Sequence, residues 1–203
     1  MSTALIALKL TEKIPDIEAD YIGADKGALI LAKAGRRMRL AIGDFDSVNP
    51  EDLKLIREYA DEMIVLNPIK DDSDSESALN HVLSLGYDRA VMTGSLGGRI
   101  DHELVNLRLV NSHPGVLVLM NEQNYIEAFT EGTYELEKMG YPYISFFTFS
   151  KAEITLENMK YPLTHRTVTW EDLYTVSNEI AKEKGILTVH SGTVLVIRSK
   201  DAE

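Results

Sequence analysis

A glycine-rich turn between an apolar run and a helical pattern holds the residues best suited to phosphate chemistry. Residues 89–92 predict a short buried strand, and three glycines follow it: Gly94, Gly97 and Gly98. From Asp101 onward apolar residues recur at helical spacing, so we expect a helix to start there. A strand, a glycine turn and a helix N-terminus bring backbone N–H groups and the helix dipole against phosphate oxygens. Arg99 adds a planar set of donors suited to phosphate.

The carboxylate of Asp101 qualifies this interpretation, because it repels phosphate unless a cation or a hydroxyl donor lies beside it. The turn therefore indicates phosphate chemistry assisted by a metal. A glycine turn alone is a weak signal, and the sequence has no Gly-x-x-x-x-Gly-Lys-[Ser/Thr] motif, which excludes a P-loop protein. His102 and Asn106 share one helix face, and we expect His102 to orient a neighbour or cap the turn.

Two further groups of acids precede or follow predicted elements. Asp44 and Asp46 are two residues apart, so an extended segment would point both to the same side, where a shared proton or a cation such as Mg²⁺ would relieve their repulsion. The alternative is a solvated turn. Asp74 follows two other aspartates at a helix N-terminus, where acids are stabilising in any case. Asp74 could also join the metal cluster, and Lys70 could contact phosphate.

Strand and helix patterns alternate through the first part of the chain. We expect strands at 4–10, 20–24, 39–43, 62–67, 89–93 and 116–120, and helices at 26–34, 50–60, 74–85 and 102–111. Such alternation is typical of a parallel sheet with helices on both faces. Polar residues follow four of the strands, and the carboxyl ends of parallel strands form the ligand crevice. We therefore expect the acids, glycines and bases to meet at one edge.

The pattern changes at about residue 122, where short runs with every-other-residue patterning predict a small antiparallel β domain. We divide the chain into an α/β domain at 1–121 and a β domain at 122–203. Taken by pattern alone, Tyr161 and Trp170 are more typical of core or interface aromatics, and Ser177-Asn178 is more typical of a turn.

Composition narrows the function classes. The chain has 203 residues, a formal net charge of -11 and no cysteine, which excludes disulfides and thiolate metal sites and fits a cytoplasmic protein. An acidic chain is a poor candidate for nonspecific nucleic-acid binding. No stretch is long and apolar enough to cross a membrane, and we interpret residues 1–10 as a strand rather than a signal peptide.

Four motifs together resemble the thiamine pyrophosphokinases of the bacterial type in order and spacing. They are Ala41-Ile42-Gly43-Asp44-Phe45-Asp46-Ser47-Val48, the run 70–79, the run 94–102 and Val176-Ser177-Asn178-Glu179. Asp25-Lys26-Gly27-Ala28 resembles an earlier element of that family. The resemblance spans nearly the whole chain. The combination of motifs is specific, although each motif alone is not.

The resemblance implies an α/β nucleotide-binding domain followed by a β-sandwich, acting as a homodimer with active sites between subunits. It implies transfer of the pyrophosphoryl group of ATP to the hydroxyl of thiamine with Mg²⁺. By position, the metal and catalytic acids would be Asp44, Asp46, Asp74 and Asp101; the ATP or phosphate contacts Lys70, Gly97, Gly98 and Arg99; and the thiamine contacts Asp25, Tyr161, Ser177 and Asn178.

The chain departs from the resemblance at two points. Tyr161 stands where eukaryotic relatives place a tryptophan against thiamine, and the first strand is followed by residues 10–15 in place of a glycine-rich turn. Two alternatives stay open. Asp44-Phe45-Asp46-Ser47-Val48 also fits the first motif of haloacid dehalogenase-like phosphohydrolases, with Asp44 as the nucleophile. The second alternative is a non-catalytic protein of the same fold that binds a nucleotide or a metal.

Overall fold

The computed structural model describes residues 2–67 and 73–202 and divides the chain into two compact units. The first unit is Met1–Asn106 with Leu119–Asn121, and the second is Leu107–Val118 with Glu122–Glu203. Lys70 and its two neighbouring aspartates lie outside the described residues, so the expected phosphate contact of Lys70 stays a prediction. Within the described ranges, no helix combines the length and apolar character needed to cross a membrane.

The first unit is built on a parallel sheet with the strand order β4-β3-β2-β1-β5. The strands are β1 (Thr3–Ala7), β2 (Asp20–Ala24), β3 (Met38–Gly43), β4 (Ala60–Val65) and β5 (Arg89–Thr93). In β1 the last four residues are buried, and in β5 four of five are, as expected for strands covered on both faces. The chain builds outward from β1 to β4 and then returns to the other side of β1, so the topological switch point lies between β1 and β5.

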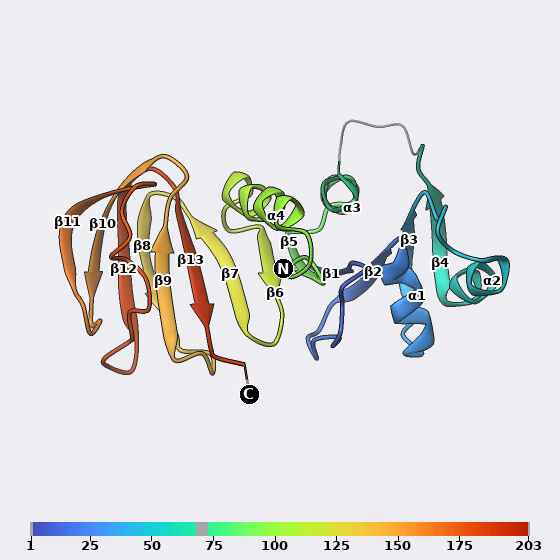
Figure 1. Ribbon diagram of the computed structural model, residues 1–203, viewed down its shortest axis with the longest axis horizontal. Coiled ribbons are helices and arrows are strands. Elements are labelled where there is room, and N and C mark those ends of the chain that lie inside the picture. Colours follow the sequence, from blue (N-terminus) through green and yellow to red (C-terminus); the bar gives the residue numbers. More distant parts are fainter. Residues whose placement is uncertain (1, 68–72, 203) are drawn as a thin grey trace. The chain divides into compact units, whose positions relative to one another are not determined.

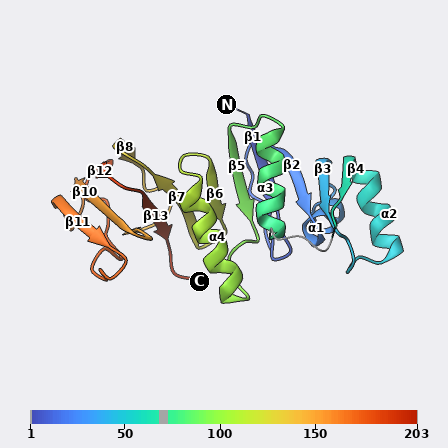
Figure 2. The same ribbon diagram turned by 90° about the horizontal axis from the view of Figure 1, so that it is seen from above.

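The described residues that accompany these strands form the helices α1 (Lys26–Lys33), α2 (Pro50–Tyr59) and α3 (Asp74–Ser84), together with α4 (Ile100–Ser112), which is divided between the two units after Asn106. Helices α1 and α3 lie on opposite faces of the sheet (Figures 1 and 2). The buried face of α1 joins Leu5 and Ala41 in one apolar cluster. Two helix starts are fixed by side chains, because Asn49 accepts a hydrogen bond from the Asp52 N–H at 2.8 Å and Ser73 accepts one from the Glu76 N–H at 3.2 Å.

The elements of the α/β unit follow the expected order, with two informative differences at their ends. The first strand ends at Ala7 rather than residue 10, because the Thr11 N–H donates to the Leu8 carbonyl at 3.1 Å and closes a turn. The last helix begins at Ile100, so Asp101 lies inside its first turn rather than at its start. Strand β6 (Leu117–Met120) is divided between the two units.

The second unit is a sandwich of antiparallel strands. One group has the order β7-β13-β9, and the other has the order β11-β10-β12-β8. The strands are β7 (Asn124–Phe129), β8 (Gly132–Leu136), β9 (Tyr143–Phe147), β10 (Lys151–Glu157), β11 (Leu163–Thr169), β12 (Gly185–Ser191) and β13 (Val194–Ser199). Phe146 and Val196 of the first group share a buried cluster with Leu156 and Leu187 of the second. The expected fold class, an α/β unit followed by an antiparallel β-sandwich, is confirmed.

Candidate active site

A hollow of about 300 Å³ lies at the carboxyl ends of the parallel strands, beside the switch point between β1 and β5. The residues that line it come from the ends of four strands and the starts of two helices: Leu8–Leu10, Ala24, Asp25, Asp44, Ser73–Ser75, Gly94, Ser95, Gly97, Arg99, His102 and Asn106. The structure thus brings five predicted site residues to one place, namely Asp25, Asp44, Asp74, Gly97 and Arg99. Lys9, from the turn after β1, adds a cation that the sequence reasoning did not identify.

The three acids of the hollow repel one another, and Asp25 shows the effect. Burial, followed by the charges of Asp74 and Asp44, raises the pKa of Asp25 to about 6, although a hydrogen bond from the Phe45 N–H lowers it. Gly43 makes the position of Asp25 possible, because a Cβ there would lie 1.9 Å from the Asp25 Oδ1 atom. The carboxylate therefore occupies space that any side chain at residue 43 would fill.

The backbone around these acids is strained. Asp25 has φ 48° and Phe45 has φ 54°, values that residues other than glycine rarely adopt. A hydrogen bond from the Asp25 N–H to the Ile42 carbonyl (2.9 Å) holds the backbone conformation of Asp25. Burial of the Phe45 ring in the core holds that of Phe45. Strain of this kind is retained where the surroundings enforce it, and it is common at functional sites.

The left-handed conformation of Phe45 corrects the expectation for Asp46. The segment from Asp44 to Asp46 is not extended, so the argument that both side chains share one side does not hold. Asp46 is exposed and is not among the residues that line the hollow. Its N–H donates to the Asp44 Oδ1 atom at 3.1 Å, which fixes the carboxylate of Asp44. The catalytic and metal roles of Asp46 stay predictions.

The glycine turn after β5 adopts conformations that only glycine takes readily. Gly94, Gly97 and Gly98 have φ values of 73°, 91° and 90°. At Gly94 a Cβ would also meet the Thr11 backbone nitrogen at 2.4 Å. The Gly97 N–H, a predicted phosphate donor, donates to the Glu103 carboxylate of α4.

Arg99 is likewise held by an acid of α4. Its Nη2 atom lies 2.5 Å from Asp101 Oδ2, and its Nε atom donates to Asp101 Oδ1 at 3.1 Å. The Arg99 guanidinium lowers the pKa of Asp101 to about 2. Asp101 is exposed in this pair and is ionised at neutral pH, which makes it a weak proton acceptor while the pair persists. The hollow is not lined by Asp101 or Gly98.

The carboxylates fit a divalent cation that also binds substrate. Among the described residues, no three His, Asp or Glu side chains are arranged to hold a metal by themselves. Mg²⁺ commonly takes one or two carboxylates and completes its shell with water and substrate phosphates. Asp44 and Asp74, which crowd Asp25 in the hollow, suit that arrangement because a cation would relieve their mutual repulsion.

The predicted thiamine contacts of the second unit form one local cluster. Asn178 is 5% exposed, and its side chain binds both the N–H (3.0 Å) and the carbonyl (2.8 Å) of Tyr161. The Ser177 N–H donates to the Ser145 hydroxyl at 3.0 Å, and Ser177 has φ 54°. The Asn178 amide therefore fixes the Tyr161 backbone, and the Tyr161 ring is 58% exposed.

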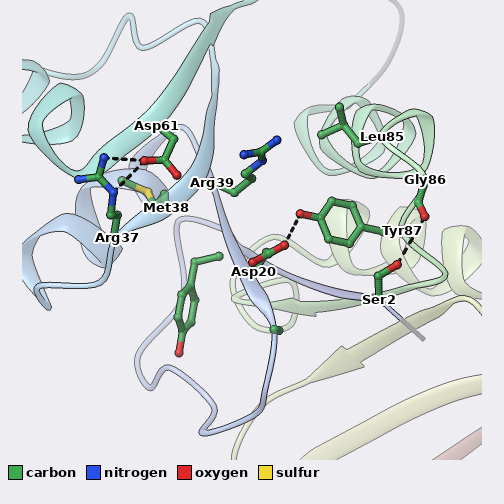
Figure 3. A pocket seen from close by; sticks show the side chains of 11 residues that line it. Ser2, Asp20, Arg37, Met38, Arg39, Asp61, Leu85, Gly86 and Tyr87 are labelled. Carbon is green, nitrogen blue, oxygen red and sulfur yellow. Dashed lines mark hydrogen bonds and ion pairs between the residues drawn. The ribbon is translucent and has the colours of Figure 1, made fainter.

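A second hollow, of about 510 Å³, is larger but does not suit the chemistry (Figure 3). Two pairs of its polar side chains bind one another: Arg37 Nη2 lies 2.6 Å from Asp61 Oδ1, and the Tyr87 hydroxyl donates to Asp20 Oδ2 at 2.6 Å. Burial and the bond to Asp20 raise the pKa of Tyr87 to about 12. This second hollow lies where β2 and β4 begin, away from the three acids and the glycine turn. We therefore place the site in the smaller hollow.

Comparison with known proteins gives matches along most of the chain. The family model "Thiamin pyrophosphokinase, catalytic domain" matches residues 16–118, and "Thiamin pyrophosphokinase, vitamin B1 binding domain" matches residues 133–194. A thiamine pyrophosphokinase of Bacillus subtilis is 35% identical over 189 residues, covering 89% of this chain and 87% of the relative.

Solved structures agree with these matches. The crystal structure of a thiamin pyrophosphokinase family protein from Enterococcus faecalis is similar with a TM-score of 0.88 and 30% identity, and all of both chains is covered. A thiamin pyrophosphokinase from Candida albicans has a TM-score of 0.78 over 98% of this chain and 89% of its own, and its 15% identity shows the fold alone.

The raised pKa of Asp25 predicts a pH-dependent stability. Because the folded state holds this proton more tightly than the unfolded state, the contribution of Asp25 to stability falls as the pH rises from about 4 to above 6. Asn keeps the acceptor oxygen and removes the charge. After a discount for solvent screening, Asp25→Asn should raise the free energy of unfolding at pH 7.5 by about 1 kcal/mol. Urea unfolding at several pH values measures this. Asp16→Asn, at an exposed loop position, is the control, and a wild-type pH slope in Asp25→Asn would contradict the prediction.

Proposed function

The chain belongs to the thiamin pyrophosphokinase family, and we propose that it transfers the pyrophosphoryl group of ATP to the hydroxyl of thiamine, giving thiamine diphosphate and AMP. The observation that carries this is the hollow at the switch point, where Asp25, Asp44 and Asp74 meet the glycine turn. In the proposal, residues 1–121 bind ATP and residues 122–203 bind thiamine. The two family models match one on each side of that division.

The proposed reaction is an in-line displacement. The thiamine hydroxyl attacks the β-phosphorus, the bond to the α-phosphate oxygen breaks, and AMP leaves. Such transfers depend on positioning and on neutralisation of charge. Asp44 and Asp74, with Asp46 beside them, would hold Mg²⁺, which when bound supplies the positive charge that the phosphate oxygens need. Asp46 would accept the hydroxyl proton, or Asp101 would do so once a phosphate has drawn Arg99 away from it.

The phosphate side of the site is the part formed by the Gly97 N–H and the Arg99 guanidinium, and carboxylates of the chain itself bind both groups. The Gly97 N–H and the Arg99 guanidinium, both proposed phosphate donors, bind Glu103 and Asp101. A phosphate group would take these donors over, so the carboxylates compete with the nucleotide. Lys70 and the Gly98 backbone complete the proposed phosphate contacts.

Thiamine carries a cationic ring, which an exposed aromatic face attracts. Tyr161 has such a face. Its ring already attracts one cation, because Lys160 Nζ lies 5.7 Å from the ring centroid. We propose that Asp25, Tyr161, Ser177 and Asn178 form the thiamine pocket, with Asn178 acting by holding Tyr161.

We propose further that two copies of the chain form a homodimer and that the thiamine residues of the second unit serve the site of the other copy. The segment before Ser177 exposes large apolar side chains, including Trp170 (60% exposed) and Leu173 (81% exposed). Exposed apolar patches of this kind mark protein contacts. Sedimentation equilibrium should give the mass of two chains, and the mass of one chain would contradict the proposal.

We also propose a cytoplasmic location, which the lack of cysteine suggests.

The phosphohydrolase alternative is not favoured. Its motif usually ends the first strand of the sheet, whereas Asp44-Phe45-Asp46 follows β3 here, and a glycine turn carrying Arg99 has no part in that chemistry. The matches to both family models leave the non-catalytic alternative without support.

The reaction type is tested by its products. With ATP, Mg²⁺ and thiamine, the protein should form AMP and thiamine diphosphate, which chromatography separates from ADP. Asp44→Asn should lower kcat/KM on the order of 100-fold, because a group that neutralises transition-state charge is lost. Asp61→Asn removes an equal charge from β4 and should leave turnover intact. Formation of ADP would refute pyrophosphoryl transfer.

The competition between Glu103 and phosphate predicts a gain of affinity. Glu103→Gln removes the charge that holds the Gly97 N–H, so the KM for MgATP should fall about threefold, in line with a change of about 0.6 kcal/mol. Initial rates at saturating thiamine measure this KM. Glu51→Gln, also in the first turn of a helix, controls for the change of net charge. An unchanged or higher KM in Glu103→Gln would show that the carboxylate does not compete.

A further inference from the structure

A single buried amide connects the glycine turn to the start of α3. Asn106 of α4 is 5% exposed, its Nδ2 atom donates to the Ser95 carbonyl at 2.8 Å, and its Oδ1 atom accepts a hydrogen bond from the Ser75 hydroxyl at 2.8 Å. Ser95 and Ser75 are also buried. Asn106 therefore uses both ends of its side chain on groups that line the hollow.

The bond to Ser75 acts on the acid beside it. Ser75 follows Asp74 directly, and its hydroxyl lies 3.1 Å from that of Ser73, the N-cap of α3. Asp74 is thus flanked by two serines whose positions depend on one another. Because Asp74 lines the hollow, the Asn106 amide helps to fix the start of α3, which carries the carboxylate that we propose for Mg²⁺.

The bond to Ser95 sets the orientation of a peptide group in the turn. A trans peptide unit points its C=O and N–H in opposite directions. With the Ser95 carbonyl bound to Asn106, the N–H of Leu96 is directed away from that amide. Glycine at residues 94, 97 and 98 makes rotation of the turn backbone inexpensive, so an anchor is required. A phosphate bound on the side of the Leu96 N–H would meet a carbonyl oxygen if this peptide rotated, and like partial charges would repel.

We propose that Asn106 is a positioning residue for the phosphate side of the site, which sets the affinity for the nucleotide and leaves the affinity for the acceptor unchanged. This inference rests on the proposed function. An anchor that fixes one conformation of the turn raises the fraction of molecules that can bind the nucleotide. When the anchor is lost, that fraction falls, and the apparent affinity for the nucleotide falls by the same factor. A purely structural amide would affect stability and would not distinguish the two substrates.

The variants separate the two hydrogen bonds. Asn106→Leu is nearly isosteric and removes both, whereas Asn106→Asp keeps an acceptor for Ser75 and loses the donor to Ser95. In both, the KM for MgATP should rise at least about tenfold, because both lose the bond to the Ser95 carbonyl. The KM for thiamine should change by less than about twofold. Ser75→Ala, which removes the other bond, should raise the KM for MgATP by less.

Asn111 provides the matched control. It lies five residues further along α4, and its side-chain oxygen is buried without a hydrogen-bond partner among the described residues. Asn111→Leu should leave both KM values unchanged. Circular dichroism establishes that each variant is folded. If Asn106→Leu does not fold, the two single variants Asn106→Asp and Ser75→Ala still test whether each hydrogen bond affects the KM for MgATP.

Direct binding separates this inference from the proposed function. Calorimetric titration with MgATP in the absence of thiamine requires no turnover. A wild-type protein that binds MgATP and forms no AMP would refute the proposed reaction, while weaker binding by Asn106→Leu would still support the positioning role. Equal MgATP affinity in wild type and Asn106→Leu would overturn it, and so would equal changes in the KM values of both substrates.

Discussion

Three carboxylates must lie close together in one small hollow, and much of the first unit serves to hold them against their mutual repulsion. Asp25, Asp44 and Asp74 come from the ends of β2 and β3 and from the start of α3. The cost appears in the raised pKa of Asp25 and in the strained backbone at Asp25 and Phe45. A packed parallel sheet can bear this cost because its buried strands fix where each chain segment ends. A divalent cation bound with substrate would remove much of the repulsion.

The proposed phosphate donors illustrate the complementary problem. The Gly97 N–H and the Arg99 guanidinium attract nearby negative charge, and α4 supplies it as Glu103 and Asp101. Each proposed donor is thus paired with a carboxylate of α4, and these pairs are separate from the three acids that line the hollow. Asn106 contributes on both sides, because its amide is bound to the turn that carries the donors and to the serine next to Asp74.

Local chemistry was sufficient to predict most elements of the first unit. Asn49-Pro50 and Ser73 begin helices through their own backbone and side-chain preferences, and the alternation of apolar runs fixed the class of the sheet. Local chemistry failed where a long-range contact decided the backbone. Phe45 is buried in the core with φ 54°, so the segment is not extended, and Asp46 does not line the hollow that Asp44 lines.

The sequence by itself determined which residue types were available for phosphate chemistry, that they follow predicted strands, and that three glycines would form the turn beside them. These are properties of neighbouring residues, and the chain encodes them directly. Tertiary structure alone decided that Asn106 bridges Ser75 and Ser95, and that Asn178 holds Tyr161. Hydrogen bonds of this kind depend on the distance and angle between side chains and their partners, and the packing of helices and strands sets both.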